Sequence, residues 1–217
     1  MSELVTEVVS YAGPDGRARP ALVWRLPAGT VAVTSGLLGG GLGVRRWIVN
    51  AQVPLDYDEP DPARHVGAIA AELGLPEGEG VGLLTAAEVT QYVTARDEGA
   101  ECVGTVGVSV PTWAAGPDGT WSPWLPGTIN LVAYVPAPLS PAAMVNAVMT
   151  VTEAKSQALA EVGIPGTGTA SDAVVVSCLP GGTEPYGGPR SVWGARLARA
   201  AHQVVVAGAE GFRARHG

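Results

Sequence analysis

The sequence predicts an α+β fold: a single domain, residues 1–217, with mostly antiparallel sheet or sheets packed with about three helices. Short apolar or alternating segments are separated by turns that draw on 30 glycines and 18 prolines, a pattern typical of strands. Only three segments predict good helices. A repeated series of strand–helix–strand units would need more helices, so we expect runs of adjacent strands.

The first quarter of the chain is predicted to be strand. Residues 4–11 and 18–26 flank the turn Gly13-Pro14-Asp15-Gly16, which predicts a hairpin. Residues 30–34 and 46–53 form two further predicted strands. They bracket a loop that contains Gly36, Gly39, Gly40, Gly41 and Gly43.

The later strands follow the same pattern. Residues 89–95 and 102–110 flank Asp97-Glu98-Gly99, which predicts a second hairpin. Residues 128–135 follow a proline-containing loop in which Trp113, Trp121 and Trp124 crowd together, either as core plugs or as a wall for a large flat ligand. Residues 173–178 are predicted to form a short buried strand.

Three helices are predicted, the first two from their caps and the third from its apolar face. The first begins at Asp61-Pro62, with proline at the first helical position, and ends at Gly74. The second begins at Ser140-Pro141 and ends at Gly163. The third runs from about Ser191 to Glu210.

Composition excludes several classes of function. A net charge of −7 and a pI near 4.9 argue against nucleic-acid binding, which needs a basic surface. No apolar run reaches the roughly 18–20 residues of a membrane span, and Glu3 and Glu7 are atypical of a signal peptide. We therefore expect no nucleic-acid partner, no membrane partner and a cytoplasmic protein. A homo-oligomer is left open.

The cysteines and histidines predict no metal site. Cys102 and Cys178 each lie in an apolar run, so we expect free buried thiols rather than a disulfide or a nucleophile. The three histidines are far apart, and no zinc-ligand spacing occurs. His65 is expected to face solvent rather than to approach a cobalt ion.

Four segments between residues 25 and 210 combine glycine with polar residues. They are LGGGLG (38–43) with RWIVNAQV (46–53), LTAAEV (84–89), GTINL (127–131), and TEAK (152–155) leading to GTGTASD (166–172). Each is a weak signal alone. In this order they resemble the adenosylcobinamide amidohydrolase family.

The resemblance implies hydrolysis of the amide that joins a corrin propionate to aminopropanol in adenosylcobinamide. The product would be adenosylcobyric acid, for cobamide salvage. The partner would be a small-molecule corrinoid that carries its own cobalt, so the resemblance implies no cofactor held by the protein.

Lys155 lies in the middle of the apolar face of the second predicted helix. A lysine on a core-facing stripe is costly unless it is paired or lines a cavity. It is either a structural or snorkelling lysine, or a catalytic cation that stabilises an oxyanion or transfers a proton.

Residues 166–172 alternate glycine with hydroxyl side chains before a buried strand. Such a loop is rich in N–H and O–H donors and can hold an oxyanion or a corrin amide. Asp172 either stabilises a turn or acts as general base for a water or a threonine nucleophile. The candidate catalytic residues are Asp172, Lys155 and Thr169, and this loop adds Thr167, Gly168 and Ser171 as candidate substrate-binding residues.

Five further residues are candidates for substrate binding. Gly40 and Gly41 allow the backbone to lie close to the corrin or adenosyl group, unless they form only a wide turn. Asn50 and Asn130 can donate and accept hydrogen bonds with amides of the substrate, and turn capping is equally consistent with either. Glu88 lies at capping-box spacing from Thr85, so a helix start rivals a role in binding.

Three other functions remain open at this point. Cleavage before Thr128, Thr167 or Thr169 would expose an N-terminal threonine nucleophile. The protein could instead be a non-catalytic corrinoid carrier or sensor. A third alternative is an anion- or nucleotide-binding module built on the glycine-rich loops.

Overall fold

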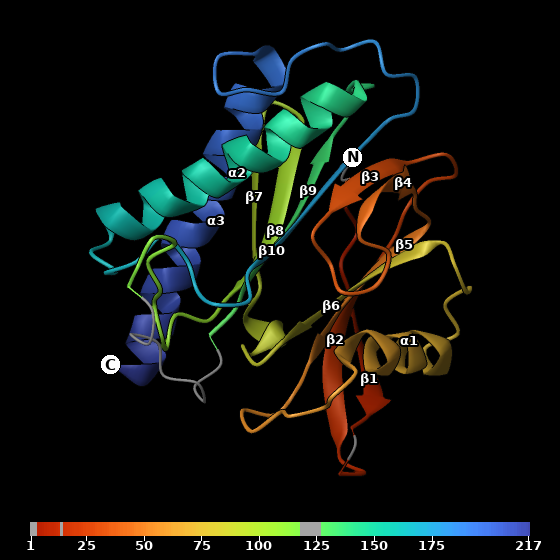
Figure 1. The fold of residues 1–217 in the computed structure, drawn as a ribbon, viewed down its shortest axis with the longest axis vertical. Helices are drawn as coiled ribbons and strands as arrows, with labels where there is room; N and C mark the ends of the chain where they lie inside the picture. Colours follow the sequence, from red (N-terminus) through yellow and green to blue (C-terminus); the bar gives the residue numbers. More distant parts are fainter. Residues whose placement is uncertain (1–3, 14, 118–126) are drawn as a thin grey trace.

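The computed structural model describes residues 4–13, 15–117 and 127–217. The described elements form four layers: one helix, a four-stranded sheet, a six-stranded sheet and a pair of helices (Figure 1). This arrangement confirms the predicted α+β class. Pro14 of the first predicted turn, Trp121 and Trp124 lie outside the described residues.

The four-stranded sheet begins with the predicted hairpin. Its strand order is β1 (Glu7–Ala12), β2 (Ala18–Arg25), β5 (Trp47–Gln52) and β6 (Gly80–Thr85). The helix α1 (Pro62–Glu72) connects the parallel pair β5 and β6 and covers the outer face. As predicted, Asp61 caps α1, because its Oδ1 accepts from Arg64 N at 3.0 Å.

The six-stranded sheet places its parallel pair in the centre. Its order is β4 (Gly41–Val44), β3 (Val31–Thr34), β10 (Ala173–Cys178), β9 (Ile129–Val135), β8 (Ala100–Val106) and β7 (Val93–Asp97). Of the eight strand pairings that the structure describes, β5–β6 and β9–β10 are parallel and the others are antiparallel.

Two helices cover the outer face of the six-stranded sheet. They are α2 (Pro141–Glu161), which connects β9 to β10, and α3 (Val192–His216), which packs beside α2 (Figure 1). Ser140 caps α2 as predicted, and Ser191, the approximate predicted start, caps α3. The third helix continues six residues past its predicted end at Glu210. No helix in the described ranges is both long and apolar enough to cross a membrane.

The two sheets pack face to face, and this contact positions the site. Apolar residues of the first sheet meet those of the second, chiefly Leu22, Trp24, Ile48 and Leu83 against Val103, Val132, Tyr134 and Val175. Side chains alternate along a strand, so the opposite faces pack against the helices. The ends of β9, β10, β5 and β6 therefore meet at one edge of the interface between the sheets.

Two strands were not predicted, β4 and β6, because both contain glycine. A Cβ at Gly80 would overlap the indole of Trp47, and one at Gly82 would press against Val66. Close packing thus requires glycine at both positions. Because glycine has a weak strand propensity, the sequence did not predict a strand there. In β4, Gly41 has φ +85°, which also departs from an ordinary strand.

The second hairpin was predicted correctly, but its first strand was placed too early. Glu98 and Gly99 have φ values of 43° and 97°, and they form a two-residue turn between β7 and β8. The strand predicted over residues 89–95 begins only at Val93, because Val89–Gln91 form a 3-10 helix. Glu88 precedes this short helix without capping it through its side chain.

Candidate active site

A cavity of about 400 Å³ lies between the two sheets, where β9 and β10 begin and where β3, β5 and β6 end. Its lining is apolar on the side of the first sheet and polar on the side of the second. The lining residues are Ser35, Leu37, Val53, Tyr57, Pro62, Leu83, Leu84, Thr85, Ala86, Thr128, Asn130, Ser171, Asp172 and Ala173. The volume is typical of a small-ligand site.

The Asp172 carboxylate forms part of the cavity wall and is held by four donors. Its Oδ1 accepts from Ile129 N at 2.9 Å and from the Thr169 hydroxyl. Its Oδ2 accepts from Thr169 N at 3.1 Å and from the Lys155 ammonium. A carboxylate has about four acceptor positions, so these contacts fix both its position and its orientation.

Lys155 forms an ion pair with Asp172 from behind the cavity wall. Its side chain extends from α2 and is only 8% exposed, and that of Asp172 is 10% exposed. The opposite charges compensate each other at this depth, which explains a lysine on an otherwise apolar helix face. A Cβ at Gly168 would overlap both Asp172 Oδ2 and Lys155 Nζ, so the ion pair requires glycine there.

Two hydroxyl groups form a pair on the same wall. Thr128 Oγ1 and Ser171 Oγ are 2.9 Å apart, and both residues line the cavity. Only one hydroxyl of such a pair donates to the other, so the second proton can point to a ligand. Thr169, by contrast, is not among the cavity-lining residues, and its hydroxyl donates to Asp172.

Asn130 lines the cavity and, as far as the chain is described, has a buried, unpaired acceptor. Its Nδ2 donates to Asn50 Oδ1 at 2.9 Å and to Leu84 O at 3.0 Å, and Asn50 Nδ2 in turn donates to Thr105 Oγ1 at 3.0 Å. These contacts fix which way the Asn130 amide points. Among the described residues, its buried Oδ1 has no hydrogen-bond partner. An unsatisfied buried carbonyl is costly, which points to a donor on a ligand.

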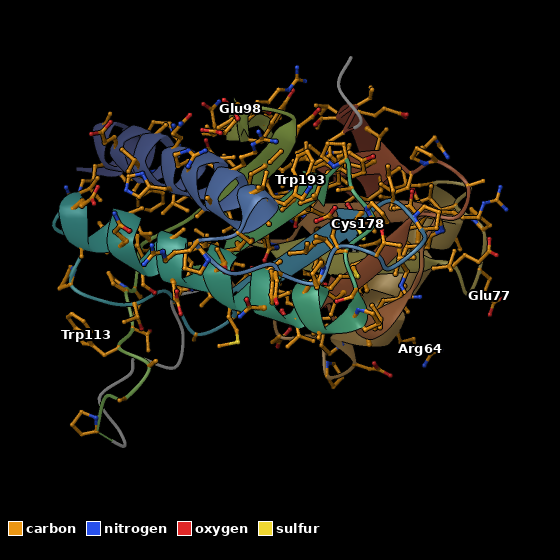
Figure 2. The ribbon with its side chains drawn as sticks, turned by 90° about the horizontal axis from the view of Figure 1, so that it is seen from above. Arg64, Glu77, Glu98, Trp113, Cys178 and Trp193 are labelled. Carbon is orange, nitrogen blue, oxygen red and sulfur yellow. The ribbon has the colours of Figure 1, made fainter. Side chains whose placement is uncertain are left out.

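The other predicted site residues lie outside the cavity lining. Thr167 Oγ1 accepts from Ala114 N at 2.9 Å and so ties its loop to a neighbouring one. Gly40 and Gly41 lie in the exposed β3–β4 turn, whose residue Leu37 does line the cavity. Glu88 is exposed, 3.8 Å from Arg215. Trp113 projects away from the body of the protein beyond α2 (Figure 2).

Sequence reasoning missed Tyr57 and misjudged the surroundings of His65. Tyr57 lines the cavity, and its hydroxyl lies 2.8 Å from Nδ1 of His65 on α1. The two rings stack with their centroids 5.5 Å apart. Burial, with a smaller contribution from the charge of Glu59, raises the pKa of Tyr57 to about 12. No motif in the sequence marks this tyrosine.

The cysteines are unsuited to catalysis. Both are free and buried, and burial raises the pKa of Cys102 to about 12 and also raises that of Cys178. Cys178 is the last residue of β10, and its Sγ lies 3.7 Å from Sδ of Met144 on α2. In the described parts of the chain, no three His, Cys, Asp or Glu residues cluster in a way that could hold a metal ion.

Comparison with known proteins gives a consistent result. A family model described as adenosylcobinamide amidohydrolase matches residues 3–216. A Methanosarcina mazei protein named adenosylcobinamide amidohydrolase is 32% identical over 189 residues, which cover 82% of this chain and 90% of that protein. A Halobacterium salinarum protein of the same name is 45% identical over 91 residues, 41% of this chain and 38% of its own length.

Proposed function

The chain belongs to the adenosylcobinamide amidohydrolase family, and on this premise we propose that it hydrolyses the amide between the corrin propionate and aminopropanol of adenosylcobinamide. The products are adenosylcobyric acid and aminopropanol. The observation that carries the proposal is the Asp172–Lys155 ion pair at the wall of a largely apolar cavity. There a fixed carboxylate can act on a substrate away from bulk water.

Only the amide-bearing arm of the substrate enters the cavity. A cavity of about 400 Å³ suits a small ligand, whereas a corrin ring with its adenosyl group is much larger. The ring therefore stays at the mouth, beside Leu37 and the β3–β4 turn. Gly40 and Gly41 expose backbone in this turn, which supports their proposed role beside the flat ring.

Asp172 is the proposed general base, and a water molecule is the proposed nucleophile. Asp172 lines the cavity whereas Thr169 does not, so a water in the cavity has the more direct access to the carboxylate. The Thr169 hydroxyl can rotate away from Oδ1 and leave this oxygen free to accept a proton from the water. The water oxygen then adds to the amide carbon. Lys155 holds Asp172 in place and balances its charge.

Polar groups on the same wall position the amide. One hydroxyl of the Thr128–Ser171 pair can donate to the carbonyl oxygen, where negative charge develops as the water attacks. The unpaired Oδ1 of Asn130 can accept from the amide N–H, and Asn50 holds it in that orientation. Gly168 and Thr167 shape the loop. The predicted substrate-binding role of Glu88 stays a prediction, because this geometry gives that residue no contact with the amide.

Several expectations about the context remain proposals. They are a cytoplasmic location, no resident metal beyond the cobalt of the substrate, no nucleic-acid partner and an undetermined oligomeric state. The net charge of −7 supports the expectation about nucleic acid.

The test is to incubate the purified protein with adenosylcobinamide, with and without EDTA, and to identify products by mass spectrometry. We expect aminopropanol and adenosylcobyric acid in both samples. Bound corrinoid recovered unchanged would favour the carrier alternative. The intact protein should remain a single species of 22.0 kDa, since a smaller species would indicate self-cleavage.

A further inference from the structure

Cleavage of an amide requires a proton at the leaving nitrogen. On the polar wall, Asp172 holds the proton that it took from the attacking water, and Asn130 Oδ1 can only accept. A donor on the opposite wall would protonate the nitrogen directly, and Asp172 would then release its proton to solvent. This inference rests on the proposed hydrolysis.

Tyr57 lies on the first-sheet side of the cavity. It belongs to the segment between β5 and α1, where its backbone N–H donates to Pro54 O at 3.2 Å and closes a turn. Its side chain lines the cavity together with Val53 and Pro62. The phenol is thus a proton-bearing group that reaches the cavity from an apolar wall, whereas Asp172 and Ser171 lie on the polar wall.

His65 connects this phenol to the protein surface. The 2.8 Å contact between Tyr57 Oη and His65 Nδ1, together with the stacked rings, fixes the phenol against α1. Tyr57 also borders a second depression of about 330 Å³, lined by Asp15, Asp56, Asp58 and Glu59 among others. His65 is partly exposed, so it can exchange protons with solvent.

We infer that Tyr57 is the general acid that protonates the leaving aminopropanol nitrogen, and that His65 replaces the donated proton. As the C–N bond of the tetrahedral intermediate breaks, its electron pair goes to nitrogen and the Tyr57 O–H proton joins that nitrogen. At the same time His65 passes a proton from Nδ1 to Tyr57 Oη and takes one from solvent at Nε2.

The phenol enters the reaction protonated, because even an unperturbed tyrosine keeps its proton at neutral pH. Burial raises the pKa of Tyr57 further, to about 12. A phenol this weakly acidic gives up its proton only as the histidine supplies another. The concerted transfer along a hydrogen bond of 2.8 Å avoids a free phenolate in an apolar wall.

The test compares three amides of adenosylcobyric acid: the aminopropanol amide, the propylamide that lacks the hydroxyl group, and the 4-nitroanilide, whose leaving group departs without full protonation. The variants are Tyr57→Phe and His65→Gln. The matched control is Tyr186→Phe, which changes an exposed tyrosine remote from the cavity lining. Circular dichroism checks the fold of each variant.

We expect Tyr57→Phe to lower kcat about 100-fold on both alkyl amides, with little change in KM. On the anilide, the same change should lower kcat less than about tenfold. His65→Gln should also lower kcat more on the alkyl amides than on the anilide, but by smaller factors. Equal losses on all three substrates would indicate a structural role, and a loss confined to the aminopropanol amide would indicate recognition of its hydroxyl. Either result overturns the inference.

Failure of the proposed function has a different signature. A wild-type protein that cleaves none of the three amides refutes the hydrolysis itself and the donor role with it. A wild-type protein that cleaves them while Tyr57→Phe matches its rates refutes only the donor role.

Discussion

Asn130 of β9 donates through its side chain to Asn50 Oδ1 of β5 at 2.9 Å, and this hydrogen bond joins the two sheets directly behind the cavity. The two residues are 80 positions apart in the sequence. The bond fixes the orientation of the Asn130 amide. Both the stability of the sheet interface and the recognition of an amide substrate are therefore expected to depend on it.

Replacement of Asn50 tests this bond. Asn50→Ala leaves Asn130 Nδ2 with Leu84 O alone and removes the donor to Thr105. We expect the free energy of unfolding in urea to fall by about 1–3 kcal/mol, and KM for adenosylcobinamide to rise. The control Gln203→Ala removes an exposed amide and should stay within about 0.5 kcal/mol of wild type. Unchanged stability of Asn50→Ala would contradict the account.

Gly168→Ala tests the space around the ion pair. The new methyl group would overlap Asp172 Oδ2 and Lys155 Nζ, so the loop or the ion pair must shift. We expect kcat to fall more than about tenfold, because small displacements of a positioned group are costly. As a control, Gly67→Ala on α1 meets no atom within 4 Å. It should keep full activity and gain about 0.5–1 kcal/mol of stability. A Gly168→Ala variant with the kcat of the wild type would contradict the proposal that this ion pair belongs to the active site.

The Lys155–Asp172 pair can be measured by a double-mutant cycle. Lys155→Met leaves a carboxylate in the wall without its cation, so we expect a loss of about 3–5 kcal/mol in the free energy of unfolding. Asp172→Asn combined with Lys155→Met removes both charges and should cost less than the sum of the single changes. Additive effects would mean that the two charges are not coupled.

Thr169→Ala separates the two possible nucleophiles. If water attacks, the variant loses only a hydroxyl that has to leave Oδ1 before the base acts, so kcat should stay within about tenfold of the wild type, whereas loss of a nucleophile would abolish turnover. The wild-type protein should then show no covalent corrinoid adduct when reactions are quenched with acid and weighed intact. An adduct located on Thr169 would assign the attack to this residue instead.

The parts of the fold that follow from local chemistry were predictable from the sequence. Asp61-Pro62 and Ser140-Pro141 mark helix starts because their side chains accept from backbone N–H groups within the same few residues. The strand β6 was missed because it contains Gly80, which the ring of Trp47 requires to be glycine. That neighbour becomes known only when the strands pair. The strand β4 was missed for a different reason, since Gly41 has a φ of +85°, which departs from ordinary strand geometry.

Part of the candidate site was also visible in the sequence. Lys155 stands out because a charge on an apolar helix face needs a partner, and the nearby Asp172 was the natural one. The Asn50–Asn130 contact and the Tyr57–His65 pair were not predictable as contacts. The first depends on how two sheets pack, and the second on how an irregular segment folds back against α1.

Turnover of Asp172→Asn on adenosylcobinamide tests the central claim most directly. The variant keeps the shape of the side chain but removes the base, and a corrinoid-binding measurement with circular dichroism shows whether the cavity is intact. With binding and fold retained, we predict that kcat falls at least about 100-fold. A kcat near that of the wild type would contradict the assignment of Asp172 as the base and of this cavity as the active site.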